Sequence, residues 1–270
     1  MENNMQNKIK NTMAFVVPKN DAEAVRIGEI LTYKTNKEVK VLVTAQTWGA
    51  SWENLEKSIK EELETLQHSH QIYGVELKGT PLFSGANIDH HYYDGDDRSN
   101  EKTSLEQVAE LIGYKLSLED MFISANDKAY IPGMYALGEA LAMPQEEIAK
   151  VVSRVRALDR AAQGISQEQE SIAEEAIAKK EVLNENSYLV RMSHSKTSTV
   201  CDRLFGTYKN LLIISEDGEV NFFGSGKVIN KLKDLVPGSW CGGDIANDNG
   251  FWGGYPSDQE SIVDIVKATL

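Results

Sequence analysis

Two adjacent histidines follow an aspartate at Asp89-His90-His91, directly after a short apolar run and before a polar stretch. Two of the five histidines in the chain therefore lie beside a carboxylate. Such side chains can ligate a metal, bind a phosphate or donate a proton. Taken alone, the triplet is equally consistent with solvated loop residues, so its interpretation depends on the rest of the chain.

Carboxylates occupy comparable positions elsewhere. Asp21 and Glu23 follow an apolar run, Glu76 lies near the end of another, and Asp127 follows the run 121–126, which we interpret as a further strand end. Carboxylate oxygens with one imidazole nitrogen suit Mn²⁺ or Mg²⁺, and the lack of a nearby thiolate disfavours a structural zinc site.

The elements that would position these side chains alternate between strand and helix. Short buried runs predict strands at 13–17, 39–43, 71–77 and 86–88, and apolar residues at helical spacing predict helices at 21–31 and 52–66. This alternation predicts a parallel sheet with helices on both faces. In such a fold, functional residues gather at the carboxyl ends of the strands.

The pattern becomes helical after residue 100 and returns to α/β near the C-terminus. Helices are predicted at 104–116, 143–163 and 166–183, and capping-box spacing joins Ser104 to Gln107 and Ser166 to Gln169. The third helix is rich in Glu and Ala, so we interpret it as the connection between domains. We expect a catalytic domain at 1–160, a linker helix at 161–184 and a smaller α/β domain at 185–270.

Composition restricts the partners. The chain has 270 residues and a net charge of −13, which disfavours a long nucleic-acid duplex but allows a small phosphorylated ligand held by a metal. Cys201 and Cys241 lack metal-type spacing, which favours a reducing cytoplasm. The first twelve residues indicate no signal peptide and no run could span a bilayer, so we expect a cytoplasmic protein without a membrane partner; a homodimer stays open.

The chain resembles the DHH phosphoesterase superfamily over nearly its whole length. The resemblance rests on Asp89-His90-His91, the acid-x-acid pair Asp21 and Glu23, and the acids Glu76 and Asp127, in this order and strand context. It implies a parallel-sheet DHH domain followed by a smaller, divergent DHHA1-like α/β domain.

The resemblance also implies residue roles. The metal ligands would be Asp21, Glu23, Glu76, His90 and Asp127, with Glu76 bridging two cations. Asp89 would coordinate or support the site, and His91 would face the substrate as phosphate binder or proton donor. The cations would activate water and neutralise charge on the phosphoryl oxygens.

Four positions depart from the family pattern. Val17 stands where members commonly have a histidine and Lys19 where they have an aspartate, while Glu23 and Glu76 replace aspartates. We therefore expect one firmly bound Mn²⁺ or Mg²⁺ and a second, weak or substrate-dependent one, with Lys19 offsetting the missing charge at the catalytic centre.

Two segments of the second domain could bind substrate. In the glycine-rich segment 238–256, Gly242 and Gly243 could offer backbone N–H groups to an anion. Trp252 with its aromatic neighbours could face a base. Asp244 occupies the position at which many family members have a substrate-binding histidine. The alternative is an ordered turn whose tryptophans close a small core. Arg191 and His194, with Ser195 and Lys196, could reach a phosphate across a cleft between domains or form a solvated loop.

Together these features favour an enzyme, a Mn/Mg-dependent phosphoesterase. We expect it to hydrolyse a small phosphorylated substrate, such as a short oligonucleotide or dinucleotide, by attack of metal-activated water on phosphorus. The alternative function is a catalytically weakened DHH-family protein that binds or senses a nucleotide without efficient turnover.

Overall fold

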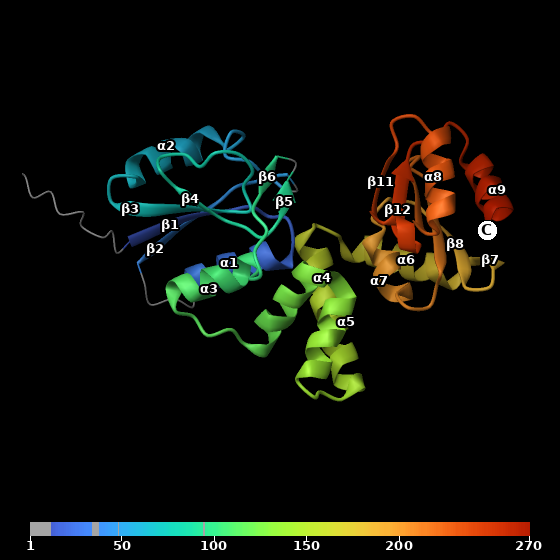
Figure 1. Cartoon of the computed structure of the whole chain (residues 1–270), viewed down its shortest axis with the longest axis horizontal. Coiled ribbons are helices and arrows are strands. Elements are labelled where there is room, and N and C mark those ends of the chain that lie inside the picture. Colours follow the sequence, from blue (N-terminus) through green and yellow to red (C-terminus); the bar gives the residue numbers. More distant parts are fainter. Residues whose placement is uncertain (1–11, 34–37, 48, 94) are drawn as a thin grey trace, which may run out of the picture. The chain divides into compact units, whose positions relative to one another are not determined.

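The computed structural model describes residues 12–33, 38–47, 49–93 and 95–270. The expectation about a signal peptide concerns residues 1–11, which lie outside the described residues, as does Asp94. The chain divides into two units, Met1–Gly164 and Ile165–Leu270 (Figure 1). Among the described residues, no helix combines the length and apolar character needed to cross a membrane.

A four-stranded parallel sheet forms the centre of the first unit. Its order is β2-β1-β3-β4, formed by β1 (Thr12–Val17), β2 (Val39–Val43), β3 (His70–Val75) and β4 (Ala86–Ile88). Residues 13–17 of β1 are all buried, as expected for a central strand covered on both faces. The parallel sheet predicted for this part of the chain is confirmed.

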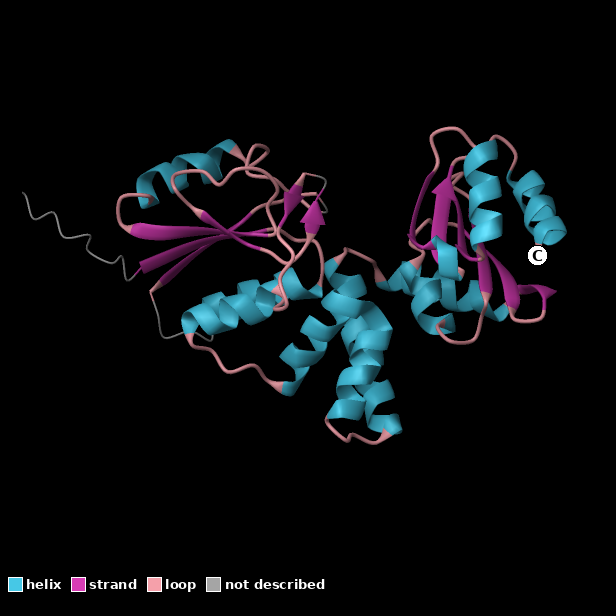
Figure 2. Ribbon diagram, viewed as in Figure 1, coloured by secondary structure: helices cyan, strands magenta, loops and turns pink. Residues whose placement is uncertain are grey.

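Helices cover both faces of this sheet (Figures 1 and 2). Ala14 and Val16 of β1 pack with Leu63 of α2 (Lys57–Leu66), whereas Phe15 and Val17 pack on the opposite face. That opposite face is covered by α1 (Ala22–Tyr33), α3 (Ser104–Ile112), α4 (Leu118–Ala140) and α5 (Gln145–Ala162).

Helix α2 begins five residues later than the sequence predicts. Trp52 is 1% exposed, and its backbone N–H donates to Lys78 O at 3.1 Å. This backbone contact pairs Trp52 with the chain after β3, and residues 52–56 precede the helix. Strand β3 also ends earlier than predicted, because Glu76 adopts a left-handed backbone with φ 51°.

The run 121–126 is helical, so its interpretation as a strand end is wrong. It belongs to α4, which is interrupted at Ala129 and Tyr130, the latter with φ 54°. Pro132 follows the interruption and has no N–H with which to continue the helical hydrogen bonds. Asp127 therefore lies at the end of the first helical segment of α4.

The helix N-termini confirm one of the two predicted capping boxes. Ser166 and Gln169 form the box of α6 (Gln167–Ala178), whereas α3 is capped by Thr103 with Glu106 instead of Ser104 with Gln107. The shift by one residue leaves Ser104 fully buried.

The second unit contains a six-stranded mixed sheet of order β11-β12-β10-β9-β8-β7. Its strands are β7 (Glu181–Asn184), β8 (Ser187–Met192), β9 (Asn210–Ser215), β10 (Val220–Gly224), β11 (Trp240–Asp244) and β12 (Asn249–Gly254). Residues of α8 (Gly226–Leu235) and α9 (Gln259–Thr269) pack on one face, and residues of α6 and α7 (Ser198–Leu204) pack on the other. The smaller α/β domain is therefore present.

Two segments of this unit differ from their sequence-based interpretation. Helix α6, expected as a linker, packs against β8 and α7, because Ala173 and Ala176 allow close approach and are buried. Residues 181–184 form β7 instead of extending the helix. The glycine-rich segment is mostly the antiparallel pair β11 and β12, where glycine leaves room for rings: a Cβ on Gly253 would lie 2.4 Å from the Trp240 ring.

We predict that Asp120→Asn destabilises the protein by about 1–3 kcal/mol. Asp120 is fully buried in α4; its Oδ1 accepts from Arg26 Nε of α1 at 2.6 Å, and its Oδ2 accepts from Ser117. Burial opposes its ionisation, but these hydrogen bonds prevail and lower its pKa. Chemical denaturation at neutral pH measures the loss.

The matched control is Glu119→Gln, one residue earlier. Its carboxylate pairs with the exposed Arg154, so we expect a change within about 0.5 kcal/mol. Equal effects of the two substitutions would contradict the role given to the Asp120 contact.

Candidate metal centre

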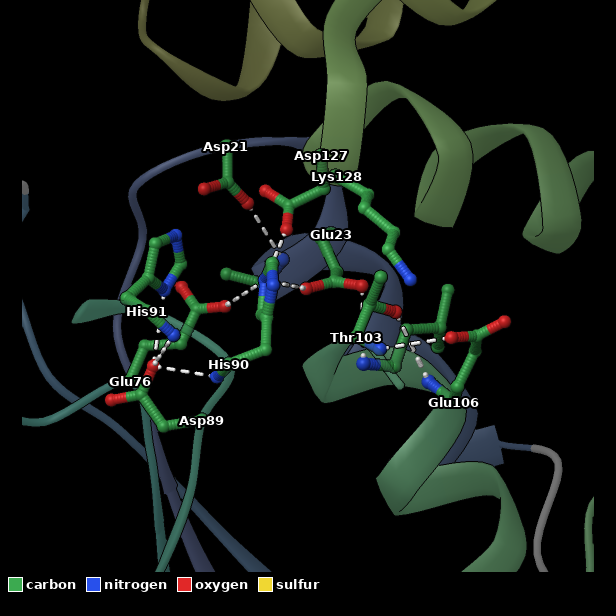
Figure 3. A network of polar contacts seen from close by, with 12 residues as sticks. Asp21, Glu23, Glu76, Asp89, His90, His91, Thr103, Glu106, Asp127 and Lys128 are labelled. Carbon is green, nitrogen blue, oxygen red and sulfur yellow. Dashed lines mark hydrogen bonds and ion pairs between the residues drawn. The ribbon is translucent and has the colours of Figure 1, made fainter. Parts of the chain in front are cut away.

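Three neighbouring strands of the first sheet end beside one group of polar side chains. Asp21 and Glu23 follow β1, Glu76 follows β3, and His90 follows β4. Because these strands are parallel and adjacent, their carboxyl ends bring the side chains to one edge of the sheet, as Figure 3 shows. The structure therefore brings together residues that the sequence places at separate strand ends.

The His90 imidazole lies in the middle of this group. Its Nε2 atom is 2.5 Å from Asp127 Oδ2, 3.8 Å from Glu76 Oε1 and 3.8 Å from Glu23 Oε2. Ligand atoms of Glu76, His90, His91 and Asp127 all lie within 4.8 Å of one another. The fourth carboxylate, that of Asp127, comes from the end of the first helical segment of α4 and not from a strand.

Asp21 and Glu23 are held by the N-termini of two helices. Asp21 Oδ1 accepts from Ala24 N at 2.9 Å in the first turn of α1, and Glu23 Oε1 accepts from Leu105 N at 3.1 Å in the first turn of α3. Free N–H groups at these positions favour a carboxylate. Each acid is thereby oriented through one oxygen, while the other oxygen stays available.

Glu76 is positioned by its unusual backbone and by a neighbouring amide. Its left-handed φ of 51° costs about 1 kcal/mol in a residue other than glycine. Its N–H donates to Ile88 O at 2.9 Å, and its Oε2 accepts from Asn20 Nδ2 at 3.1 Å. These contacts stabilise the turn that directs the carboxylate toward His90.

Asp89 orients the two histidines. Its Oδ1 accepts hydrogen bonds from the backbone N–H of His90 at 2.9 Å and of His91 at 3.0 Å, and it lies 3.0 Å from His91 Nδ1. With its other oxygen 3.4 Å from Arg98 Nη1, Asp89 supports the cluster through hydrogen bonds. His91, 34% exposed, is the more accessible of the two imidazoles.

Three buried carboxylate oxygens of this cluster, Asp21 Oδ2, Glu23 Oε2 and Glu76 Oε1, have no hydrogen-bond partner. The buried atoms His90 Nε2 and Asp127 Oδ2 contact each other at 2.5 Å. Buried polar atoms are rarely left unsatisfied, so a set of orphaned atoms around one point calls for a ligand. Four carboxylate oxygens and one imidazole nitrogen are the donors that Mn²⁺ or Mg²⁺ takes, so the residues present fit a divalent cation.

Burial also raises the pKa values of the carboxyl groups in this cluster. Burial, with the nearby charge of Asp127, raises the pKa of Asp21 to about 7. Burial and the charges of Asp21 and Asp127 raise the pKa of Glu76 to about 8, and burial with the charges of Asp127 and Glu76 raises the pKa of Glu23 well above its usual range. These carboxyls therefore hold protons near neutral pH unless a cation replaces them.

Asp89 and His91 form a pair in which the pKa of the carboxyl is lowered and the pKa of the imidazole is raised. Burial opposes ionisation of Asp89, but its hydrogen bonds with His91 prevail and lower its pKa. The hydrogen bond to Asp89 raises the pKa of His91 to about 9, so His91 is an imidazolium at neutral pH.

Sequence reasoning missed several supporting residues. Asp159 of α5, 4% exposed, accepts from Ala22 N at 3.1 Å and from Arg156 Nη1 at 2.8 Å, and Arg156 Nη1 also donates to Asn126 Oδ1. These bonds connect the start of α1 to the segment carrying Asp127. The sequence contains a signal for the burial of Asp159, because this residue continues the helical spacing of the apolar Ile148, Val152 and Val155.

Val17 and Lys19, two of the positions that depart from the family pattern, lie in different surroundings. Val17 is 1% exposed and packs in the core under α1, whereas the Lys19 side chain is exposed and its backbone N–H donates to Gln46 O. Val17 thus contributes packing and no ligand atom.

The basic group predicted in the second unit is engaged in internal contacts. Arg191 donates to both carboxylate oxygens of Glu260, at 2.7 and 3.0 Å, and to Glu181 at 3.2 Å. His194 Nε2 lies 3.0 Å from Gln169 O, and its Nδ1 accepts from Lys196 N at 3.2 Å. Ser195 follows His194 and accepts from Thr197 N through its carbonyl oxygen.

The glycine-rich segment divides between the core and the surface. Trp252 has no exposed surface and packs with Phe222 and Leu212, so its proposed use as a stacking face is wrong. Trp240 and Phe251 are 41% and 40% exposed instead.

The remaining residues of this segment lie in β11. Gly242 pairs with Phe251 and Gly243 with Gly250, while Asp244 Oδ2 accepts from Asn247 Nδ2 at 2.8 Å.

Comparison with known proteins adds little. No family model matches this sequence, and no curated protein matches it. A crystal structure of an uncharacterized protein from Helicobacter pylori G27 aligns with 96% of this chain and 99% of its own, at 9% identity and a TM-score of 0.31. The functional argument therefore depends on the residues of this chain.

We predict that the metal-free protein loses stability as the pH rises from about 4 to about 8. Asp21 and Glu76 bind protons more tightly when folded, with pKa values of about 7 and 8 against usual values of 3.8 and 4.5. Their stabilisation is complete below the unfolded values and disappears as the pH passes the folded values. Thermal unfolding in EDTA across this range measures it.

Mn²⁺ should reverse the loss, raising the melting temperature more at pH 8 than at pH 5, because binding needs the ionised carboxylates. A Mn²⁺ effect that is equal at both pH values, or absent at both, would contradict a cation site formed by these acids.

Proposed function

We propose that this chain belongs to the DHH phosphoesterase superfamily and is a divalent-metal-dependent phosphohydrolase. The observation that carries the proposal is the group of buried carboxylates around His90. Oxygens of Glu23, Glu76 and Asp127 lie 2.5 to 3.8 Å from its Nε2 atom, and buried oxygens of Asp21, Glu23 and Glu76 have no hydrogen-bond partner. The same five residues are the ligands that the family resemblance implies from the sequence. Agreement between the motif order and an independent geometric cluster supports the assignment more than either alone.

Each residue of the centre has a distinct chemical task. Asp21, Glu23, Glu76, His90 and Asp127 would hold Mn²⁺ or Mg²⁺, which when bound lowers the pKa of water and offsets charge on phosphoryl oxygens. Because Asp89 engages His91 through Nδ1, the imidazolium can offer Nε2 to a phosphoryl oxygen or to a leaving group. Asp89 holds the ring in that orientation.

The substrate proposed is a small phosphorylated molecule such as a short oligonucleotide or a dinucleotide. A net charge of −13 opposes tight binding of long polyanions. Local neutralisation by a cation allows one phosphoryl group to enter a site lined by carboxylates.

A nucleotide-binding protein without efficient turnover is the second candidate. Val17, buried in the core, supplies no ligand where family members commonly have a histidine, so one cation position lacks a donor. Ligand binding without hydrolysis is the outcome expected if two cations are needed for chemistry.

Turnover tests the first candidate. Purified protein with Mn²⁺ is incubated with an aryl phosphodiester, a panel of dinucleotides and pyrophosphate, beside the Asp127→Asn variant. We expect hydrolysis of at least one phosphodiester and a loss of at least about 100-fold in the variant, since Asp127 Oδ2 faces His90 Nε2 at 2.5 Å.

Glu56→Gln is the matched control, because Glu56 is an acid of the same unit that accepts from Thr44 and Ala45 outside the cluster. Its activity should stay near that of the wild type. Stabilisation by nucleotides without hydrolysis would favour the binding protein, and neither effect would reject both candidates.

Metal content gives a separate prediction. After dialysis against metal-free buffer, we expect about one tightly bound Mn²⁺ per chain. The donors around His90 suit one cation, and Val17 supplies no ligand for a second one. Elemental analysis measures the ratio, and two tightly held ions per chain would contradict the expectation.

A further inference from the structure

A cavity of about 670 Å³ lies in the first unit, between the segment before α2 and the loop that connects β3 to β4. Its lining includes Ser51, Lys60, Lys78, Thr80, Leu82 and Phe83. The volume lies in the range of small-molecule sites. None of the six residues belongs to the metal-binding cluster.

Two lysines give the cavity a positive side. Lys60 Nζ donates to the backbone oxygen of Glu53 at 2.6 Å, and Lys78 Nζ lies 5.0 Å from the centre of the Tyr93 ring. Within the described part of the chain, neither amine has a carboxylate at ion-pair distance, whereas Lys57, on the same helix as Lys60, pairs with Glu61. Glu53 also lines the cavity, so the lining holds two amines and one carboxylate. In a chain of net charge −13, this local excess of positive charge favours an anionic ligand.

The loop between β3 and β4 forms the apolar side of the cavity. Phe83 and Ser84 both have left-handed backbones, with φ 52° and 55°, and Gly85 N closes the turn onto Leu82 O at 2.9 Å. Two consecutive residues other than glycine are strained in this conformation, and such strain is common at ligand-binding loops. The turn places Leu82 and Phe83, both partly exposed, along the cavity.

The cavity adjoins the candidate metal centre through a continuous set of side chains. Lys78 is two residues beyond Glu76 and packs on Tyr93, whose ring centre is 6.1 Å from that of His91. A ligand in the cavity would therefore lie near the accessible face of the centre.

We propose that this cavity binds the part of the substrate remote from the reacting phosphorus, as a nucleoside monophosphate moiety. Lys60 and Lys78 contact its phosphate, the Ser51 and Thr80 hydroxyls add hydrogen bonds, and Leu82 and Phe83 contact its base. The identity of the ligand rests on the proposed function, whereas the site itself rests on the cavity and its charges.

Titration calorimetry of the full chain in EDTA tests the site with AMP and with inorganic phosphate as probes. We expect AMP to bind and to bind about tenfold more tightly than phosphate, because only AMP reaches the apolar side. Lys60→Ala and Lys78→Ala should each weaken AMP binding about tenfold, whereas Lys57→Ala, paired with Glu61 on the same helix, should leave it unchanged.

Phe83→Leu should reduce the preference for AMP over phosphate while leaving phosphate binding as it was. Thermal unfolding of each variant verifies that it is folded. No AMP binding at millimolar concentration, equal AMP affinity for wild type and both lysine variants, or equal affinity for AMP and phosphate would overturn the proposal.

Failure of this inference can be distinguished from failure of the proposed function. EDTA removes any contribution from a bound cation, and the loss of AMP binding in the Lys60 and Lys78 variants separates binding in the cavity from binding at His91. Hydrolysis of an aryl phosphodiester with Mn²⁺ reports on the metal centre alone, because that probe carries no nucleoside.

Discussion

The structure of the first unit depends on a concentration of carboxylates around one imidazole, away from water. Asp21, Glu23 and Glu76 are each 5% exposed or less, and burial is the largest cause of their raised pKa values. Such a group is stable when protons or cations neutralise it, and it is unfavourable when all its members are ionised together. The surrounding fold supplies the geometry that keeps these groups close despite that cost.

The support for this cluster is distributed among many elements. Adjacent parallel strands bring three loops to one edge, and the N-termini of α1 and α3 each bind one carboxylate oxygen. Asp127 ends the first helical segment of α4, just before its interruption. Asp159 on α5 joins the start of α1 to Arg156. One oxygen each of Asp21, Glu23 and Glu76 is thus bound by the protein, while the other oxygen is left for a ligand.

The second unit illustrates how polar residues singled out by type can have structural tasks. Arg191 forms ion pairs with Glu260 and Glu181, and Trp252 fills the core between the sheet and α8. Two exposed aromatic rings of the unit, Trp240 and Phe251, lie over glycines of the neighbouring strand. Side-chain type alone cannot separate these roles, because the register of the β11 and β12 pair decides which face each residue occupies.

The sequence by itself determined the α/β class, the strands of the parallel sheet and the acids beside Asp89-His90-His91, because strand periodicity and residue type are local properties. Tertiary structure alone decided that Asp127 comes from an interrupted helix, that Asp89 orients the histidines, and that Asp159 and Asn20 support the acids. It also decided that Lys60 and Lys78 share a cavity although they are distant in the chain. These outcomes depend on contacts between elements far apart in sequence, and no local pattern specifies which distant atoms will meet.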